Sequence, residues 1–298
     1  MTAQPGLPDP AVELEAWRAR RYAALRQPIG WLTLAGLSWL GEGLNRIGTD
    51  ARNRVRLPAG PPHAGTLHVR GRDVRATSAP GGFTHGGLPV EGLALVADVD
   101  APDGEPTMLE LGTLRMCTIR RGPGGGRLGV RTWDTHSPAR TAFAGIDHWP
   151  FDPGWVVRAT FEPAADGARI GVPDVLGEVV EEYLAGQIAF ERAGRSHRLR
   201  VLRGGPAGEL WLVFADATNG LETYAGGRFV YSEVPDGAGP EGLRTVTVDF
   251  NRAYNPPCVF SPHATCPLPP PGNRLELRVE AGEKLYRSPD LERGPRVD

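Results

Sequence analysis

Glycine and proline set the strongest limit on the fold of this chain. The 298 residues include 40 glycines and 29 prolines, nearly a quarter of the sequence. Both are unfavourable inside helices, glycine because it loses the most backbone entropy and proline because it lacks an amide hydrogen. Many long helices are therefore excluded, and strands joined by turns are favoured.

One helix is predicted at the start of the chain. Asp9 can cap it, Pro10 suits its first position, and Pro28 ends it, so residues 1–28 are expected to form an N-terminal helical segment. Its apolar stripe consists of Leu14, Trp17, Tyr22 and Leu25. Its arginines are expected to form a solvated face: Arg18, Arg20, Arg21 and Arg26.

From Trp31 onward, apolar residues mostly alternate with polar or small ones, the pattern of half-buried strands. We predict a mostly β protein with two packed antiparallel sheets or a partly open barrel, and one N-terminal α-helix. Residues 29–298 would form the β-rich domain. A weak connection at 163–177 would divide it into lobes 29–165 and 175–298, unless it is a long surface loop.

Composition excludes several classes of partner. The formal net charge is −2, so we predict no nucleic-acid partner. The longest apolar run is interrupted before it reaches the length of a membrane span, so we predict no membrane partner. Three cysteines and no visible secretory signal predict a cytoplasmic protein without a disulfide framework. The oligomeric state is left open.

A proline-rich block from Asp249 to Arg274 (DFNRAYNPPCVFSPHATCPLPPPGNR) carries most of the candidate chemistry. Its aromatic residues and cysteines are unlike those of a solvated linker, so we expect a rigid segment held against the body of the protein. The side chains of Asn251, Asn255 and Asn273 can bind a ligand or bond to local backbone in turns.

This block, followed by AGEKLY, resembles the signature of domain-of-unknown-function family 1684 (DUF1684), an uncharacterised bacterial and archaeal family. Three earlier strings fit the same resemblance: WLTLAGLSWLGEGLNRIGTD, RTWDTHSPARTAF and DATNGLETYAGGRF. The resemblance extends from Trp17 to Tyr286 and implies no established activity. This chain differs from the family pattern at His263, where the family often has an aromatic residue such as tyrosine.

Three strands are expected to place polar residues at one sheet edge. If 209–215, 228–233 and 243–250 form a meander, then Asp216, Arg228 and Asp249 meet there, each aspartate about 5 Å from Arg228. Thr223 and Tyr224 would overhang this edge from the loop at 218–227. The cluster is interpreted either as a functional site or as a structural ion-pair network.

We predict no cofactor, and the alternative is a zinc site. Cys258, His263 and Cys266 supply three ligand types within nine residues, and Cys117 could be a fourth. A C-x2-4-C knuckle is absent, so buried free thiols are favoured over zinc, and a Cys258–Cys266 disulfide is favoured least.

Arg131 and Lys284 are two further cationic candidates for a functional site. Arg131 and Trp133 share a strand face suited to carboxylate or phosphate recognition, with a surface salt bridge as the simpler interpretation. Lys284 is the only lysine of the chain. It would reach the polar cluster of Asp249, or form an ion pair with Glu283 or another acid.

Two functions follow from these candidates. The first is a soluble small-molecule enzyme, hydrolase- or lyase-like. The second is a non-catalytic β module whose polar cluster grips an anionic ligand or locks the fold. The catalytic candidates are Asp249, Tyr254, Asp216 and Lys284. The ligand-binding candidates are Arg228, Tyr224, Thr223, Asn251, Arg252, Asn255, Arg131 and Asn273. We predict that no metal is bound. The expected partner is a small molecule, which is anionic in the second function.

Overall fold

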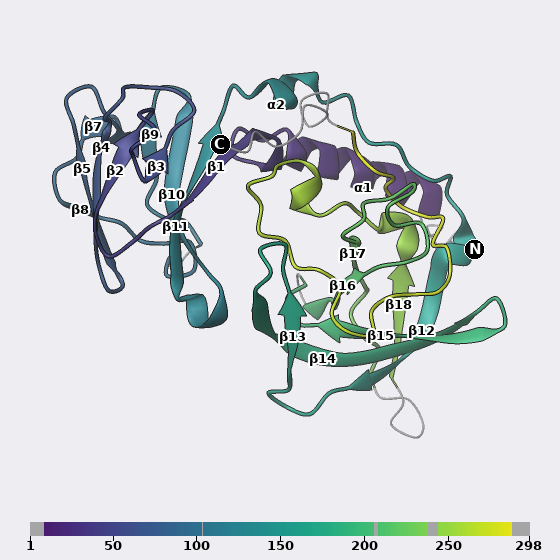
Figure 1. Ribbon diagram of the computed structural model, residues 1–298. Helices are drawn as coiled ribbons and strands as arrows, with labels where there is room; N and C mark the ends of the chain where they lie inside the picture. Colours follow the sequence, from purple (N-terminus) through teal and green to yellow (C-terminus); the bar gives the residue numbers. More distant parts are fainter. Residues whose placement is uncertain (1–8, 103, 206–207, 238–243, 288–298) are drawn as a thin grey trace, which may run out of the picture. The chain divides into compact units, whose positions relative to one another are not determined.

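The computed structural model describes residues 9–102, 104–205, 208–237 and 244–287, and confirms a mostly β protein with one N-terminal helix (Figure 1). The chain forms two compact units. The sandwich unit comprises Leu25–Phe143 and Ser261–Ala264. The barrel unit comprises Met1–Ala24, Ala144–Phe260 and Thr265–Asp298.

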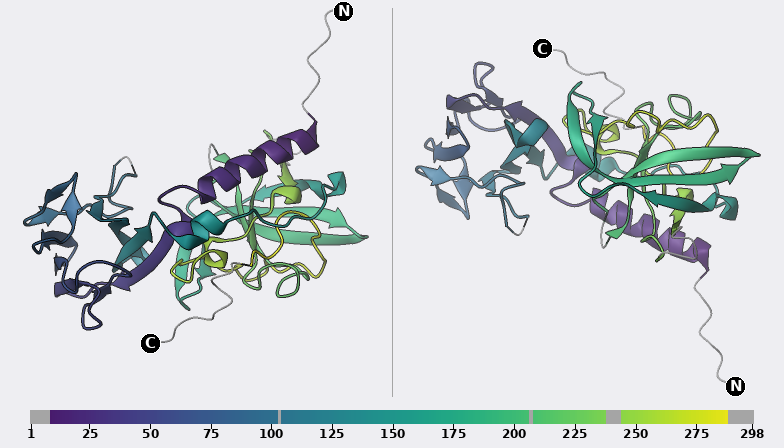
Figure 2. Two further views of the ribbon diagram at one scale, coloured as in Figure 1. Left: turned by 90° about the horizontal axis from the view of Figure 1, so that it is seen from above. Right: turned by 90° about the horizontal axis from the view of Figure 1, so that it is seen from below.

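Helix α1 spans Pro10–Leu25, as the capping signal predicts. Asp9 Oδ1 accepts a hydrogen bond from the amide of Ala11 at 2.9 Å. Leu14 and Leu25 are buried, and Trp17 and Tyr22 are half-buried. Because its apolar stripe is narrow, α1 depends on contacts with the barrel, along which it lies in both views of Figure 2.

The sandwich unit contains two sheets. The first has the order β1-β11-β10-β9-β6-β7, and the second β3-β2-β4-β5-β8. Their apolar faces enclose one core, in which Ile47 and Leu67 of the second sheet join Met116 and Val130 of the first. The strands are β1 Leu34–Trp39, β2 Gly43–Gly48, β3 Val55–Arg56, β4 Gly65–Arg70, β5 Asp73–Ser78, β6 Thr84–His85, β7 Leu88–Pro89, β8 Leu93–Ala94, β9 Leu109–Leu111, β10 Leu114–Arg121 and β11 Arg127–Asp134. Its short helices are η1 Trp31–Thr33, η2 Pro123–Gly125 and α2 Pro138–Ala142.

The barrel unit is built from one curled antiparallel sheet of order β17-β16-β15-β14-β12-β18, with β13 paired to β14. Its strands are β12 Val156–Pro163, β13 Arg169–Pro173, β14 Val179–Arg192, β15 Arg195–Leu202, β16 Trp211–Phe214, β17 Arg228–Tyr231 and β18 Arg244–Asp249. Its 3-10 turns are η3 Pro153–Trp155, η6 Phe250–Arg252 and η7 Pro257–Val259. The segment 163–177 lies within this unit, because β13 pairs with β14.

The sheet closes on itself at one end only. Ser232, just after β17, forms a bridge with Val248 of β18, and the amide of Glu233 donates to the carbonyl of Thr247 at 2.8 Å. At the other end, Phe229 pairs with Tyr254 instead of with β18. The barrel is therefore partly open, and the segment after β18 occupies the opening.

The barrel core is aromatic and includes the C-terminal segment. Phe250 lies within 6 Å of three other rings, those of Trp155, Phe190 and Phe214. Val279 and Ala281 are fully buried in the same core. We call residues 273–285 the strap, because backbone bonds tie this segment to the end of β16 and to residues 147–149 and 253.

Candidate functional site

Asp216 and Arg228 form a fully buried polar pair in the barrel. Arg228 begins β17 and Asp216 follows β16, and neither side chain is exposed. Arg228 Nη2 donates to Asp216 Oδ2 at 2.8 Å. Burial lowers the pKa of Arg228, and the carboxylate of Asp216 opposes this shift. The predicted proximity of these two residues is confirmed.

Arg228 also holds the strap. Its Nη2 donates to the carbonyl of Val279 at 2.8 Å, and its Nη1 donates to the carbonyls of Ala281 and Glu283. Asp216 Oδ1 in turn accepts the amides of Thr218 and Val279. The network therefore joins two strands to the strap, as expected of a structural ion pair.

Asp249 does not join this network, which corrects the prediction that both aspartates meet Arg228. Its carboxylate accepts the amide and Nδ2 of Asn251 and lies 3.2 Å from Arg252 Nε. The reason is where the two strands meet: β18 is bridged at Val248 to Ser232, beyond the end of β17 that is distant from Arg228, while Phe229 beside Arg228 pairs with Tyr254. Arg228 therefore has one aspartate partner instead of two.

Asn251 and Asn273 bond to distant backbone, where the turn interpretation expected local bonds. Asn251 exchanges two hydrogen bonds with the backbone of Asp152. Asn273 Nδ2 donates to the carbonyls of Arg200 and Val213, and its Oδ1 accepts the amide of Arg200. Since the described ladder between β15 and β16 consists of the pair Leu202–Trp211, the Asn273 side chain supplies hydrogen bonds that a longer ladder would have made.

The strap presents a buried carboxylate that sequence reasoning did not select. Glu283 is fully buried, and both of its oxygens accept hydrogen bonds from Arg21 of α1. Glu283 Oε2 also accepts the amide of Asn255 at 2.7 Å. Gly282 makes the turn possible, because its φ is +79° and a Cβ there would clash with the carbonyl of Ala253.

Arg21 was expected on the solvated face of α1, and this expectation is wrong. Its side chain is 15% exposed, and its guanidinium lies 4.5 Å from the centroid of the Tyr254 ring. Tyr254 also contacts Trp17, Phe229 and Tyr231. Burial raises the pKa of Tyr254, so its phenol is protonated at pH 7.

Lys284 lies against an aromatic ring, and the expected pairing with Glu283 is not formed. Its Nζ is 4.2 Å from the centroid of Trp149. Its amide donates to the carbonyl of Asp147, and its carbonyl accepts Asn255 Nδ2 at 2.7 Å. Glu283 is not available to Lys284, because Arg21 occupies it.

Three enclosed polar atoms around residues 282–284 have no hydrogen-bond partner within the described ranges: Asn255 Oδ1, Trp149 Nε1 and His148 Nε2. His148 forms a backbone bridge with Glu283, and its Nδ1 lies 2.7 Å from the carbonyl oxygen of Ile146. Buried polar groups usually have partners, so such a group needs an explanation such as a ligand. AGEKLY was the sequence signal that could have led to Glu283 and its neighbours.

The loop at 218–227 is held mainly by its own bonds. Thr223 is buried, and its Oγ1 lies 2.8 Å from Thr218 Oγ1. The backbone carbonyl of Tyr224 accepts Asn219 Nδ2, and burial raises the pKa of the half-buried Tyr224. In the described part of the chain, neither side chain forms a hydrogen bond with Asp249, whose partners are Asn251 and Arg252.

The two cysteines of the proline-rich block are joined to each other. Cys258 and Cys266 form a disulfide with 6.1 Å between their Cα atoms, which corrects the preference for free thiols. The loop geometry explains the bond, because this Cα separation suits a disulfide. His263 belongs to the sandwich unit and Cys117 is buried there, and the described residues contain no group of three or more metal-ligating side chains.

Arg131 belongs to β11 of the sandwich unit. Its guanidinium lies 5.3 Å from the centroid of Trp31 and 5.9 Å from that of Trp133. The predicted shared face of Arg131 and Trp133 is therefore present.

Fold and site together define a mostly β protein whose barrel is tied at one end by a C-terminal strap. The family model described as "Protein of unknown function (DUF1684)" matches residues 141–284, from α2 into the strap. The chain belongs to this family. The match covers the second half of the resemblance expected from Trp17 to Tyr286.

Among solved structures, one with a similar sequence can be compared with this chain. It is the solution NMR structure of an uncharacterized protein of Haloarcula marismortui, 32% identical, with a match covering 49% of this chain and 79% of that one and a TM-score of 0.40. No curated protein matches the chain. Among the described residues, no helix has both the length and the apolar character needed to cross a bilayer.

Proposed function

We propose that this protein binds a small anionic molecule at the strap, where Lys284 lies against Trp149. The position of Lys284 carries the proposal. Its ammonium lies over the indole, and no carboxylate of the described residues forms an ion pair with it. An ammonium without a counter-ion attracts an anion, and the neighbouring ring orients the cation.

The atoms beside Lys284 extend the expected chemistry of the ligand. Trp149 Nε1 is a hydrogen-bond donor and Asn255 Oδ1 is an acceptor, and both are enclosed without a partner in the described part of the chain. A carboxylate or phosphate would satisfy Lys284 and Trp149, while a hydroxyl group of the same ligand would satisfy Asn255. A hydroxy acid or a sugar phosphate has this combination.

An enzyme, hydrolase- or lyase-like, is the second candidate, and His148 favours it. The carbonyl of Ile146 accepts from Nδ1, which leaves Nε2 as the unprotonated nitrogen. Burial lowers the pKa of His148, so the ring is neutral at pH 7 and suited to act as a general base. Asp216 and Asp249 have less support, because hydrogen bonds and cations already occupy their carboxylates.

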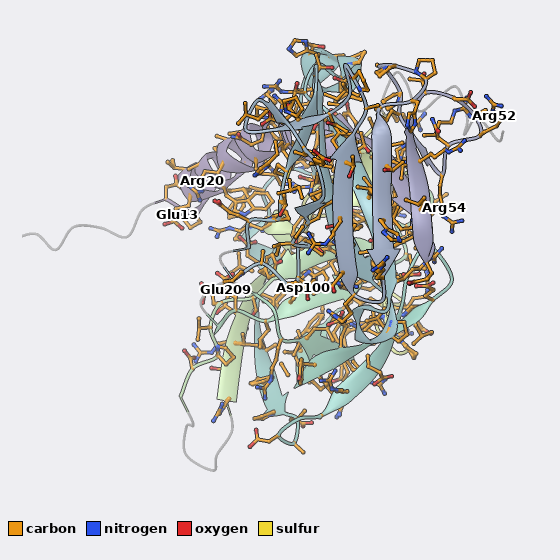
Figure 3. The ribbon with its side chains drawn as sticks, turned by 90° about the vertical axis from the view of Figure 1, so that its left-hand side faces the viewer. Glu13, Arg20, Arg52, Arg54, Asp100 and Glu209 are labelled. Atoms are coloured by element: carbon orange, nitrogen blue, oxygen red, sulfur yellow. A yellow bond between two sulfur atoms is a disulfide. The ribbon has the colours of Figure 1, made fainter. Side chains whose placement is uncertain are left out.

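Calorimetric titration with a panel of hydroxy acids and sugar phosphates tests the proposal. At least one compound should bind the wild type and bind Lys284→Met at least tenfold more weakly. Trp149→Phe should weaken the same compound by a smaller factor, because it removes the Nε1 donor but keeps an aromatic ring at this position. Arg20→Met is the control for loss of one charge, since Arg20 is exposed on α1 (Figure 3). Equal affinities in wild type and Lys284→Met would refute the site.

Hydrolysis of ester and phosphate substrates by wild type and His148→Gln tests the second candidate. Turnover by the wild type that is lost in His148→Gln would support an enzyme.

A cytoplasmic location stays a prediction. A disulfide such as Cys258–Cys266 is more typical of oxidising compartments than of the cytoplasm. Measuring whether these two cysteines are oxidised or reduced in the cell therefore tests the predicted location.

A further inference from the structure

The sandwich unit contains a buried guanidinium without a counter-ion. Arg131 is 8% exposed, and its Nε is enclosed with no hydrogen-bond partner among the described residues. No carboxylate described in the structure forms an ion pair with it. Buried charges are normally paired or bonded, so this arrangement is unusual for a group with only a structural role.

The titratable groups near Arg131 do not neutralise it. Cys117 is its cross-strand partner on β10, and burial raises the pKa of that thiol to about 12, so it carries no charge at pH 7. Asp98 is occupied by Arg121, whose Nη1 lies 2.6 Å from its carboxylate. Burial, with a smaller effect of Arg121, lowers the pKa of Arg131 to about 10, so the guanidinium is still protonated at pH 7.

The surroundings of Arg131 fit a binding role. Trp31 and Trp133 both lie within 6 Å of the guanidinium carbon. Indole rings stabilise the cation without using its N–H groups, which stay free for an acceptor. In such a poorly hydrated setting, a two-pronged hydrogen bond from guanidinium to an oxyanion is stronger than in water.

We propose that Arg131, with the rings of Trp31 and Trp133 close by, is the centre of an oxyanion-binding site that takes the carboxylate or phosphate group of a small soluble molecule. This site lies in the sandwich unit, outside the segment 141–284, and does not depend on the strap. The two flanking indoles make their fluorescence a direct reporter of occupancy.

The test is a fluorescence titration of the full chain with inorganic phosphate and, separately, with acetate at constant ionic strength. We expect a saturable change with one of the two anions in the wild type and in Lys284→Met. Arg131→Gln should abolish it or weaken binding at least tenfold, and Arg131→Lys should weaken binding severalfold because it lacks the planar fork. Arg169→Gln is the matched control, since Arg169 also stacks on an aromatic ring, that of Tyr183, but is exposed.

The anion that saturates identifies the ligand class, phosphate or carboxylate. An unchanged curve in Arg131→Gln would overturn the proposal, and so would the absence of a saturable change with both anions in the wild type. If Arg131→Gln does not fold, the Arg131 Nε–H resonance of isotope-labelled wild type, assigned with Arg131→Lys, replaces it. That resonance should shift on titration, and a resonance that does not move would refute the site.

Discussion

Nη2 of Arg228 donates to the carboxylate of Asp216 over 2.8 Å, and neither side chain is exposed to solvent. The same guanidinium binds three carbonyls of the strap. The pair therefore ties β16 and β17 to a segment that follows them by more than forty residues. Its environment favours stability over catalysis, because few of its hydrogen-bonding groups remain free.

Arg228→Met should lower the free energy of unfolding by about 3–5 kcal/mol, because it leaves the Asp216 carboxylate buried without a cation. Urea denaturation measures this change. Arg158→Met is the control, since Arg158 forms an exposed ion pair with Asp236 and should cost less than about 1 kcal/mol. Replacing Asp216 by Leu in the Arg228→Met background should recover part of the loss. Equal effects of Arg228→Met and Arg158→Met would contradict the structural role.

Arg21 and Arg20 are neighbours on α1 with opposite environments. Arg21→Met removes the hydrogen bonds to the buried Glu283 carboxylate and should cost about 2–3 kcal/mol, because Glu283 loses its cation. It should also raise the rate of amide hydrogen exchange in α1. Arg20→Met should change neither quantity measurably, since Arg20 is exposed. If both variants behave alike, the contact with Glu283 does not hold the helix.

The sequence predicts which helices and strands form better than it predicts which strands lie side by side. Asp9 and Pro10 correctly predict the start of α1, and alternating apolar residues correctly predict a mostly β protein. Alternation shows that one face of a strand is buried, but not which strand lies beside it. For that reason the partnership of β16 with β17 follows from their adjacency in the chain, whereas that of β18 with β12 does not.

The candidate site depends on contacts that have no sequence period. Glu283 and Arg21 are 262 residues apart, and Asn273 reaches backbone 60 and 73 residues away. Such side-chain bonds are formed only once the strap is in place, and no local propensity encodes them. Lys284 was found because the chain contains no second lysine, but its contact with Trp149 could not be derived from composition.

The disulfide between Cys258 and Cys266 should stabilise the proline-rich segment. Closing a loop of this size stabilises a protein by about 2–3 kcal/mol in the chain-entropy model. Dithiothreitol should therefore lower the melting temperature of the wild type, and should leave the doubly substituted Cys258→Ser, Cys266→Ser variant unchanged. Mass spectrometry after alkylation, with and without reduction, shows whether the bond is present. A wild type with three alkylated cysteines before reduction would contradict it.

His148 should make stability depend on pH on the acidic side of neutrality. Burial, with a smaller contribution from Arg18, lowers its pKa below the value of about 6.5 that an unperturbed histidine has. Between the folded pKa and about 6.5, the unfolded chain binds a proton that the native protein does not. The free energy of unfolding should therefore fall as the pH drops from about 6.5 towards the folded pKa, by up to about 1.4 kcal/mol per pH unit. Above about pH 6.5, His148 should contribute no pH dependence to this free energy.

Urea midpoints of wild type and His148→Gln at pH 8, 6.5 and 5.5 measure this effect. Burial also lowers the pKa of His263, which contributes to the slope of both proteins, so the difference between the two slopes isolates His148. His136→Gln is the control because His136 is exposed, and it should retain the wild-type slope. His148→Gln should lose stability less steeply than wild type as the pH falls, because glutamine takes up no proton. Parallel slopes would show that His148 titrates in the native protein as it does in the unfolded chain.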